Sequence, residues 1–224
     1  MNEPPEPERL PAVVTIAALY GAGGSRISPL VAEQLGVQFL DRAIPSSLAT
    51  RAGLPERAVA EFDEKPQSRG QRLLAVLARA SPPSGASGQV ERVDLEERRL
   101  RAEVEDFLAD ASRSGGVMLG RGGAIVLAEV PGALHVHLGG DRKARVERVM
   151  EWQGVDRETA AHNVKVNDQA RRDYVRSAYG VDGDNPQLYH LMVDATALGV
   201  DVCVDLIVAA SESRVRQAAT AAPR

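Results

Sequence analysis

A cluster of glycines near the start of the chain is the first candidate for chemistry, because it separates the apolar run at residues 13–19 from a segment with helical spacing. Glycines at such a turn let backbone N–H groups approach a phosphate that a Cβ would keep away. A helix N-terminus adds about half a positive charge. A plain tight turn fits the same pattern. The candidate phosphate-binding residues are Gly21, Ala22, Gly23, Gly24, Ser25 and Arg26.

This loop departs from the Walker pattern GxxxxGK[ST] at two positions. With Ser25 aligned to the hydroxyl that binds Mg²⁺, Ala18 stands at the first glycine and Gly24 stands at the lysine. Arg26 is then the nearest cation, and we expect it to replace part of the charge that the lysine supplies. Slow phosphoryl transfer is the expected consequence.

Two starting points fit the helix that follows the loop. Its apolar residues continue to Leu35, and Gly36 is a suitable stop. If the helix begins at Gly24, Pro29 lies inside it and removes a backbone hydrogen bond. If Ser28 is the N-cap, Pro29 takes the first helical position, where proline is well tolerated. The sequence leaves both starts open.

Arg121 is a second candidate, because it lies in the glycine-rich segment 120–123 after the predicted strand at residues 117–119. Ligands of open α/β sheets bind at the carboxyl ends of the strands. The planar guanidinium of an arginine can bind a phosphate through two hydrogen bonds. The alternative is an arginine in an ordinary surface turn.

Asp41 ends another predicted strand, at residues 37–40, on the same edge of the sheet as the glycine loop. It could orient a Mg²⁺-bound water or accept a proton. It could equally cap a helix.

Basic side chains are frequent after the predicted strand at residues 134–138. Movable arginines stabilise the charge of a transferring phosphoryl group and exclude water on closure. A solvated helix surface is the alternative. The residues are Arg142, Lys143, Arg145, Arg148, Arg171, Arg172 and Arg176.

The remaining polar groups favour structural roles. Histidine packing is favoured over a metal site, since no ligand cluster supports one. The stretch around Asp182 and Asp184 favours a turn over a calcium loop. Cys203 excludes an intrachain disulfide and is expected to be buried. The four histidines are His135, His137, His162 and His190.

Apolar segments and helical segments alternate along the chain. This alternation predicts an α/β fold, a parallel sheet of about five strands with helices on both faces. The strand at 117–119 should lie beside the strand at 13–19 through a right-handed crossover. The predicted strands are residues 13–19, 37–40, 117–119, 134–138 and 191–194, and the later helices are 73–77, 90–112, 141–152, 157–174 and 198–210.

Composition excludes some classes of function. The 224 residues carry a net charge of −4, which gives no basic field for nucleic acid or an anionic membrane. No apolar run is long enough to span a bilayer, and the N-terminus lacks the features of a signal peptide. We therefore expect a cytoplasmic protein with one domain at residues 12–212 and disordered tails at 1–11 and 213–224.

Several segments together resemble one known family. The matching segments are Tyr20-Gly21-Ala22-Gly23-Gly24, Phe39-Leu40-Asp41-Arg42, Gly120-Arg121-Gly122, Arg145-Val146-Glu147-Arg148-Val149-Met150, Asp168-Gln169-Ala170-Arg171 and Asp194-Ala195-Thr196. In this order and spacing the chain resembles the cytidylate-kinase-like family, relatives of bacterial cytidylate kinase.

The resemblance implies the P-loop nucleoside-monophosphate-kinase fold with a helical lid at about 142–180. It implies transfer of the γ-phosphoryl group from ATP to a nucleoside monophosphate with Mg²⁺, a CMP-like acceptor being favoured. Ser25 would meet the metal, Arg121 the acceptor phosphate, and Arg171 or Arg172 would belong to the lid. Gly122 stands where cytidylate kinases carry an aspartate that helps to read the base.

The expected catalytic residues are Arg26, Asp41, Arg121, Arg171 and Arg172. The expected partners are nucleotides, and a homodimer is left open. The alternative function is a non-catalytic or weakly active nucleotide-binding module of the same fold.

Overall fold

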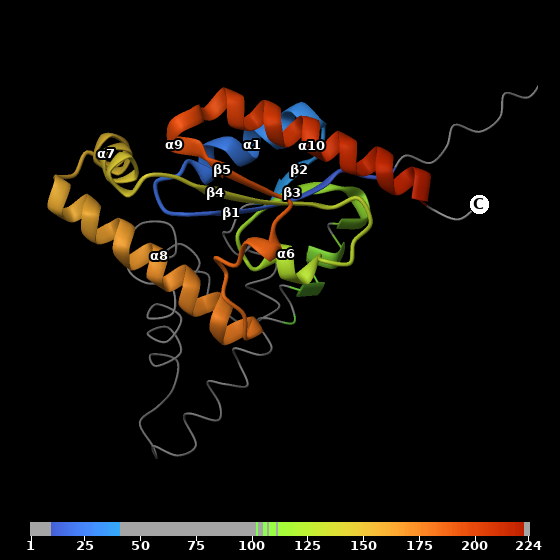
Figure 1. The fold of residues 1–224 in the computed structure, drawn as a ribbon, viewed down its shortest axis with the longest axis horizontal. Helices are drawn as coiled ribbons and strands as arrows, with labels where there is room; N and C mark the ends of the chain where they lie inside the picture. Colours follow the sequence, from blue (N-terminus) through green and yellow to red (C-terminus); the bar gives the residue numbers. More distant parts are fainter. Residues whose placement is uncertain (1–9, 41–101, 103–104, 107, 111, 222–224) are drawn as a thin grey trace, which may run out of the picture.

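The structure is a computed structural model that describes residues 10–40, 102, 105–106, 108–110 and 112–221. Its sheet has five parallel strands in the order β2-β3-β1-β4-β5 (Figure 1). The strands are β1 Val13–Ala18, β2 Gln38–Leu40, β3 Gly116–Leu119, β4 Leu134–Gly139 and β5 Leu191–Asp194. Because β3 pairs with β1, the predicted strand neighbours and the predicted parallel α/β fold are confirmed.

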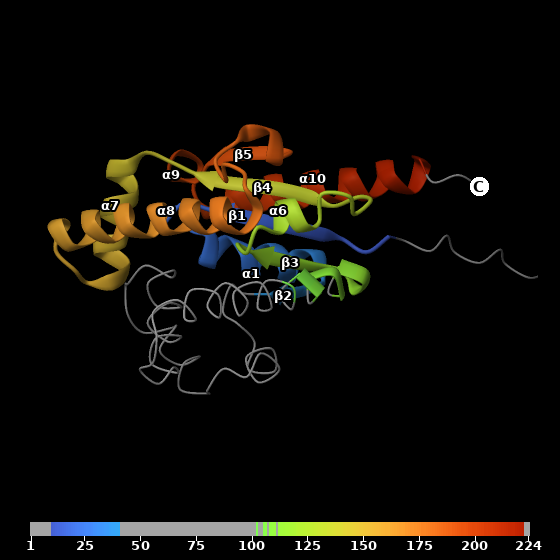
Figure 2. The same ribbon diagram turned by 90° about the horizontal axis from the view of Figure 1, so that it is seen from below.

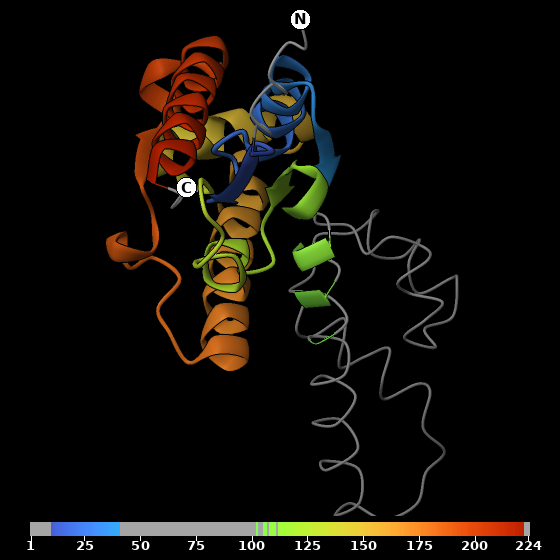
Figure 3. The same cartoon turned by 90° about the vertical axis from the view of Figure 1, so that its right-hand side faces the viewer.

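Helices cover both faces of the sheet. In Figure 1, α1, α9 and α10 lie on one face and α6 and α8 on the other, while α7 lies at one end of the strands. Figure 2 shows α8 running alongside the sheet, and Figure 3 shows the two helical layers end-on. The helices are α1 Gly24–Leu35, α6 Gly123–Val126, α7 Arg142–Gln153, α8 Arg157–Tyr179, the short 3₁₀ turn η1 Pro186–Leu188, α9 Ala195–Leu198 and α10 Val200–Ala221.

Strand β4 divides its side chains between the two faces. Val136 and Leu138 join the main core, which also contains Ile27 of α1 and Ile207 of α10. The histidines of β4 face the side that carries α6 and α8, because neighbouring residues of a strand point to opposite faces. The sheet thus separates an apolar layer from a more polar one.

Helix α1 begins at Gly24, directly after the glycine loop, and not at Ser28. The alternative with Ser28 as N-cap is therefore wrong. Pro29 lies inside the helix, so Ser25 loses the intrahelical donor that residue 29 would normally supply. Gly36 ends the helix in the left-handed conformation, as predicted.

The C-terminal part of the chain is more helical than expected. Helix α10 continues to Ala221, so the expected disordered tail from residue 213 is a helix over most of its length. The reason is packing, since Arg214 donates to the carbonyl of Ala133 at 3.2 Å and Ala218 lies against Gly132. Helix α8 likewise continues to Tyr179, five residues beyond the predicted end at Tyr174.

Other expectations meet the structure in part. Cys203 is buried, as predicted, and burial raises the pKa of its thiol. The helix predicted at 73–77 lies outside the described residues, as do residues 1–9 and most of the helix predicted at 90–112. Among the described residues, no helix combines the length and apolar character that a bilayer crossing requires.

Candidate functional site

The glycine loop connects β1 to α1 at the carboxyl end of the sheet. Gly21 and Gly23 have φ angles of +82° and +93°, which residues with a side chain rarely adopt. Ala22 closes the turn by donating its N–H to the Leu19 carbonyl at 3.0 Å. Gly23 is the N-cap of α1, and no side chain caps this helix end.

Three backbone N–H groups at this helix end have no acceptor in the part of the chain that the structure describes. Within the described residues, Gly23, Gly24 and Ser25 donate to no carbonyl or side chain, whereas Arg26 donates to the Gly23 carbonyl at 2.9 Å. The first turn of a helix leaves such donors for a cap, for water or for a ligand. Three free N–H groups in sequence fit an anion, and the positive end of the helix favours it.

A cavity of about 230 Å³ adjoins these groups. It is enclosed by the loop, by Leu119 of β3 and by Trp152 and Gln153 of α7. The Arg26 guanidinium lies over the Trp152 ring, with its carbon 4.9 Å from the ring centre. Arg26 is exposed in the first turn of α1, so its charge lies beside the cavity, held by an aromatic ring.

Gly24, at the Walker-lysine position, has no space for a side chain. An added Cβ would lie 2.6 Å from the Cβ of Ala18 and 3.1 Å from a methyl of Leu119. Ala18 stands where the Walker pattern has its first glycine. The two departures from the pattern are therefore spatially linked, because the Ala18 methyl occupies the space that a lysine would need.

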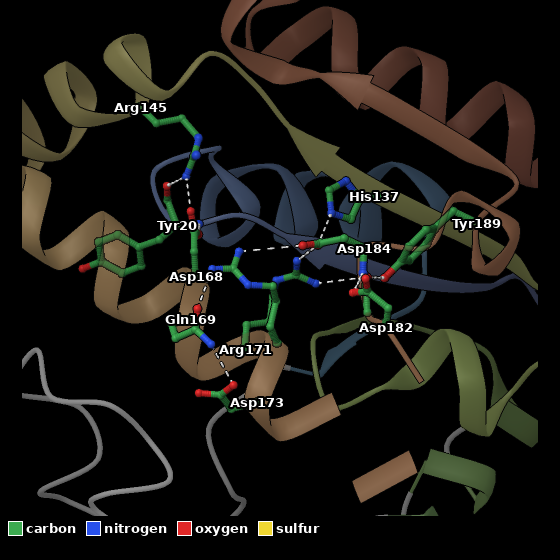
Figure 4. Close-up of polar contacts among 12 residues, drawn as sticks. Tyr20, His137, Arg145, Asp168, Gln169, Arg171, Asp173, Asp182, Asp184 and Tyr189 are labelled. Carbon is green, nitrogen blue, oxygen red and sulfur yellow. Dashed lines mark hydrogen bonds and ion pairs between the residues drawn. The ribbon is translucent and has the colours of Figure 1, made fainter. Parts of the chain in front are cut away.

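Arg171, one of the two predicted lid arginines, pairs with Asp184 of the loop after α8 (Figure 4). Arg171 forms an ion pair and hydrogen bond with Asp184 and donates to the Gly183 carbonyl at 3.3 Å. Arg172 lies 3.8 Å from the other Asp184 oxygen. Asp182 accepts the Asp184 N–H, so this segment is a turn, as predicted.

His137 lies beside this pair. Its buried Nε2 has no hydrogen-bond partner among the described residues and lies 3.7 Å from the Asp184 carboxylate. Burial, followed by the charge of Arg171, lowers the pKa of His137 from 6.5 to about 4. The ring is therefore neutral at neutral pH. In the sheet register His137 is paired with Ala17, and β1 ends one residue later, before the glycine loop.

His135 is also buried, and its ring stacks on His190 with centroids 4.8 Å apart. Its Nδ1 lies 2.8 Å from the Thr15 hydroxyl, and burial lowers its pKa to about 4. Among the described residues, no three histidine, cysteine or acidic side chains gather as a metal site.

Arg121 follows β3 in a left-handed conformation, with φ of +59°. Its carbonyl accepts a hydrogen bond from the Tyr179 hydroxyl at 3.1 Å. The Tyr179 ring closes the space beside Gly122, where an added Cβ would lie 2.4 Å from the ring. An aspartate at residue 122 therefore has no room in this arrangement. That the Arg121 side chain enters the cleft stays a prediction.

The other predicted basic residues lie apart from the cavity. Arg142, Lys143 and Arg176 are exposed, and Arg148 donates to the carbonyls of Ala195 and Thr196. Asp41 lies outside the described residues.

Sequence reasoning did not identify three further residues at the site. Trp152 encloses the cavity, Asp168 binds the backbone before the glycine loop, and Asp184 pairs with Arg171, a predicted lid arginine. Asp168 is buried, although it lies in the middle of a helix whose polar composition predicts an exposed side chain. Its place in one of the segments that resemble the family was the only signal that it has another role. The contacts of Trp152 and Asp168 reach across the fold, and Asp184 pairs with arginines of the preceding helix, so no helical or strand spacing reveals them.

Comparisons with known proteins agree with this architecture. An uncharacterized protein from Eubacterium ventriosum has a TM-score of 0.64 at 18% identity, covering 91% of this chain and 99% of that one. A gluconokinase from Sinorhizobium meliloti has a TM-score of 0.50 at 15% identity, covering 95% and 96%. At these identities the likeness concerns the fold, which is that of P-loop kinases.

A sequence relative is a uronate isomerase from Corynebacterium glutamicum, 30% identical over 137 residues. The match covers 61% of this chain and 26% of that protein, so the chain spans about a quarter of the relative's length. The family described as cytidylate kinase-like matches residues 13–197, from the first strand into α9. The chain therefore belongs to the cytidylate kinase-like family.

Proposed function

We propose that this protein binds Mg·ATP at residues 21–25 and transfers its γ-phosphoryl group to a nucleoside monophosphate, with a CMP-like acceptor favoured. The observation that carries the proposal is the set of free N–H groups of Gly23, Gly24 and Ser25 at the start of α1. These donors fit the donor phosphates of a nucleotide, and the adjoining cavity gives them a place. Family membership supports the same assignment.

In the proposed reaction an oxygen of the acceptor phosphate attacks the γ-phosphorus of ATP. The bond to the bridging β–γ oxygen breaks, and ADP leaves with that electron pair. The acceptor oxygen is already ionised at neutral pH, so this step needs no strong base. The protein's contribution is positioning and charge, which are the main terms in phosphoryl transfer.

Arg26 is the candidate cation at the side of the cavity. Its guanidinium is held over Trp152 at the side of the cavity, and Gly24 contributes only its N–H. Arg171 and Arg172 would add charge from α8 once a phosphate competes with Asp184 for them. Arg121 would bind the acceptor phosphate at the carboxyl end of β3.

Mg²⁺ fits this site through few protein ligands. The Ser25 hydroxyl lines the cavity at the Walker position, and Mg²⁺ at nucleotide sites takes most of its ligands from phosphates and water. Bound there, the ion would neutralise charge that develops between the donor phosphates. Asp41 stays a further candidate for a water-mediated contact.

A non-catalytic nucleotide-binding module is the second candidate function. One observation favours it, namely that the lysine position is closed by Ala18 and Leu119 while the free N–H groups remain. Such a module would bind ATP through its backbone and transfer the phosphoryl group slowly or not at all.

Two measurements test the proposal. Thermal unfolding with ATP, with and without Mg²⁺, should show stabilisation of about 2.7 kcal/mol at roughly 100 times the Kd. Single-turnover assays with labelled ATP and a panel of nucleoside monophosphates should then show transfer, fastest with CMP or a close analogue. ATP binding without transfer to any monophosphate supports the second candidate, and no ATP binding contradicts both.

Arg26→Ala sharpens the assay. We expect transfer to slow by about a hundredfold, because a preorganised cation is lost, while ATP binding through the backbone survives. Arg216→Ala is the matched control, since Arg216 is exposed on α10 and is not among the predicted lid or catalytic arginines. An Arg26→Ala variant as fast as the parent would remove Arg26 from the catalytic machinery.

A further inference from the structure

The backbone of Tyr20, immediately before the glycine loop, is held from both sides by a buried ion pair (Figure 4). Its N–H donates to Asp168 Oδ1 at 2.9 Å, and its carbonyl accepts from Arg145 Nη1 at 2.9 Å. The same two side chains bind each other at 2.8 Å. We call Arg145 and Asp168 the Tyr20 clamp.

The two halves of the clamp come from different helices. Arg145 lies in the first turn of α7, where its Nε also donates to the Gly140 carbonyl at 3.2 Å. Asp168 lies in the middle of α8. One peptide segment, at the entrance of the glycine loop, is therefore the point at which β1, α7 and α8 meet.

Burial of this ion pair carries a cost in desolvation free energy. The side chains of Arg145 and Asp168 are 6% and 10% exposed. Burying an ion pair costs solvation free energy that the attraction between the two charges barely offsets, and a well-packed apolar pair is often as stable. Fold stability alone therefore explains the clamp poorly. What the charges achieve here, and an apolar pair could not, is two directed hydrogen bonds to the Tyr20 backbone.

The residue after Tyr20 shows why the position of the Tyr20 backbone matters. Gly21 lies against α7, where an added Cβ would be 2.7 Å from the Arg145 carbonyl and 3.1 Å from Val149. The backbone at Gly21 is thus confined by the helix that carries one clamp residue. A shift of Tyr20 would move the turn that presents the free N–H groups.

We propose that Arg145 and Asp168 are positioning residues that set the conformation of the glycine loop and couple it to α7 and α8. The functional consequence rests on the proposed donor-phosphate site. Arg171 follows Asp168 by three residues on α8, so one helix both fixes the loop and carries a lid arginine. Nucleotide binding and the placement of that arginine are then linked through the clamp.

The test replaces the clamp by an apolar pair, Arg145→Met with Asp168→Leu, which keeps the burial and removes the directed bonds. The matched control is Arg157→Met with Glu147→Leu, an exposed pair 3.5 Å apart that also joins α7 to α8 and does not line the cavity. Melting temperature, Mg·ATP affinity by calorimetry and amide exchange of Ala22 and Arg26 are measured for each protein.

We expect the apolar clamp variant to melt near the parent, to bind Mg·ATP about tenfold more weakly and to exchange its Ala22 amide about tenfold faster. The control variant should match the parent in binding and exchange. Parent-like binding and parent-like Ala22 exchange in the apolar variant would overturn the proposal.

The exchange measurement separates this inference from the proposed function. It is made without nucleotide, so it decides the clamp even if the parent binds no ATP. If the apolar variant does not fold, Asp168→Asn takes its place, because asparagine keeps an acceptor for Tyr20 and loses the charge facing Arg145. Faster Ala22 exchange in that variant supports the clamp, and unchanged exchange refutes it.

Discussion

At the scale of single residues, the glycine loop departs from the Walker pattern at two positions, one side chain being larger and the other smaller than the pattern has. Residue 18 is alanine where the pattern has glycine, and residue 24 is glycine where the pattern has lysine. Since an added Cβ at Gly24 would lie 2.6 Å from the Cβ of Ala18, a lysine at residue 24 is strained as long as Ala18 keeps its methyl. The loop keeps its backbone donors and lacks the usual cation.

This pairing predicts the outcome of rebuilding the lysine. Gly24→Lys alone should destabilise the protein and leave transfer no faster. Ala18→Gly together with Gly24→Lys should raise the single-turnover rate by about 10²-fold, because a cation returns to the donor phosphates. Ala18→Gly alone is the control and should leave the rate unchanged. A single Gly24→Lys variant as fast as the double variant would show that Ala18 is no obstacle.

His137 predicts a pH dependence of stability. Its pKa is lowered from 6.5 to about 4 by burial, so the unfolded chain binds a proton that the folded chain does not. This contribution is complete above the unfolded pKa and is lost as the pH falls toward the folded one. Arg171 and Arg145 add to the lowering, and Asp168 opposes it.

Between about pH 7 and about pH 5, His137 should account for a loss of about 2 kcal/mol in the free energy of unfolding. His137→Gln should remove that part, which denaturant titrations at both pH values would measure. His162→Gln, at an exposed position of α8, is the control. An equal loss in the parent and in His137→Gln would show that His137 does not stay neutral in the fold.

At the scale of elements, the strands were predictable because buried parallel strands are short apolar runs. Val14 and Ile16 of β1 and Val136 and Leu138 of β4 carry that signal, and all are in the core. Helix ends were less predictable. The extension of α10 depends on Arg214 reaching the Ala133 carbonyl, a contact between distant segments that no helix propensity encodes.

The candidate site divides in the same way. The glycine loop is local, so its residues could be found from composition and order. Trp152 and Asp168 could not, because each matters through a partner far away in the chain, such as Tyr20 for Asp168. Asp184 could not either, because its pairing with Arg171 depends on how the turn after α8 folds back. The start of α1 was open for a different reason. Ser28 and Pro29 match the usual sequence of an N-cap followed by a first helical residue, but the helix begins earlier, at Gly24, directly after the glycine loop.

Pro29 is the element-scale prediction. Inside α1 it leaves the Ser25 carbonyl without its intrahelical donor. Pro29→Ala should therefore stabilise the protein by about 1–3 kcal/mol, less what proline gains by restricting the unfolded chain. Thermal unfolding measures this, with Glu33→Ala at an exposed position of the same helix as control. A destabilised Pro29→Ala variant would mean that the proline fits this helix.

At the scale of the whole molecule, the carboxyl edge of the sheet gathers the parts of the proposed site. The glycine loop follows β1, Leu119 ends β3, and α7 after β4 encloses the cavity. That residues 142–180 act as a movable lid stays a prediction. In the conformation described, α7 and α8 are joined to the loop through the Tyr20 backbone, so any lid movement has to involve that contact.

The central claim is that the free N–H groups at the start of α1 hold the donor phosphates, and two glycines of that helix provide a matched test. Gly23 and Gly36 cap its two ends with φ of +93° and +66°. Both have room for a methyl, since the nearest atom to an added Cβ at Gly23 is 3.5 Å away and Gly36 has none within 4 Å. Alanine therefore brings a similar backbone strain to each end.

The measurement is calorimetric titration of Mg·ATP into the parent, Gly23→Ala and Gly36→Ala. We predict that the parent binds, that Gly36→Ala binds like the parent, and that Gly23→Ala binds about tenfold or more weakly, because the methyl lies among the phosphate donors. Equal affinities for the two variants, or a parent that does not bind Mg·ATP, would contradict the claim.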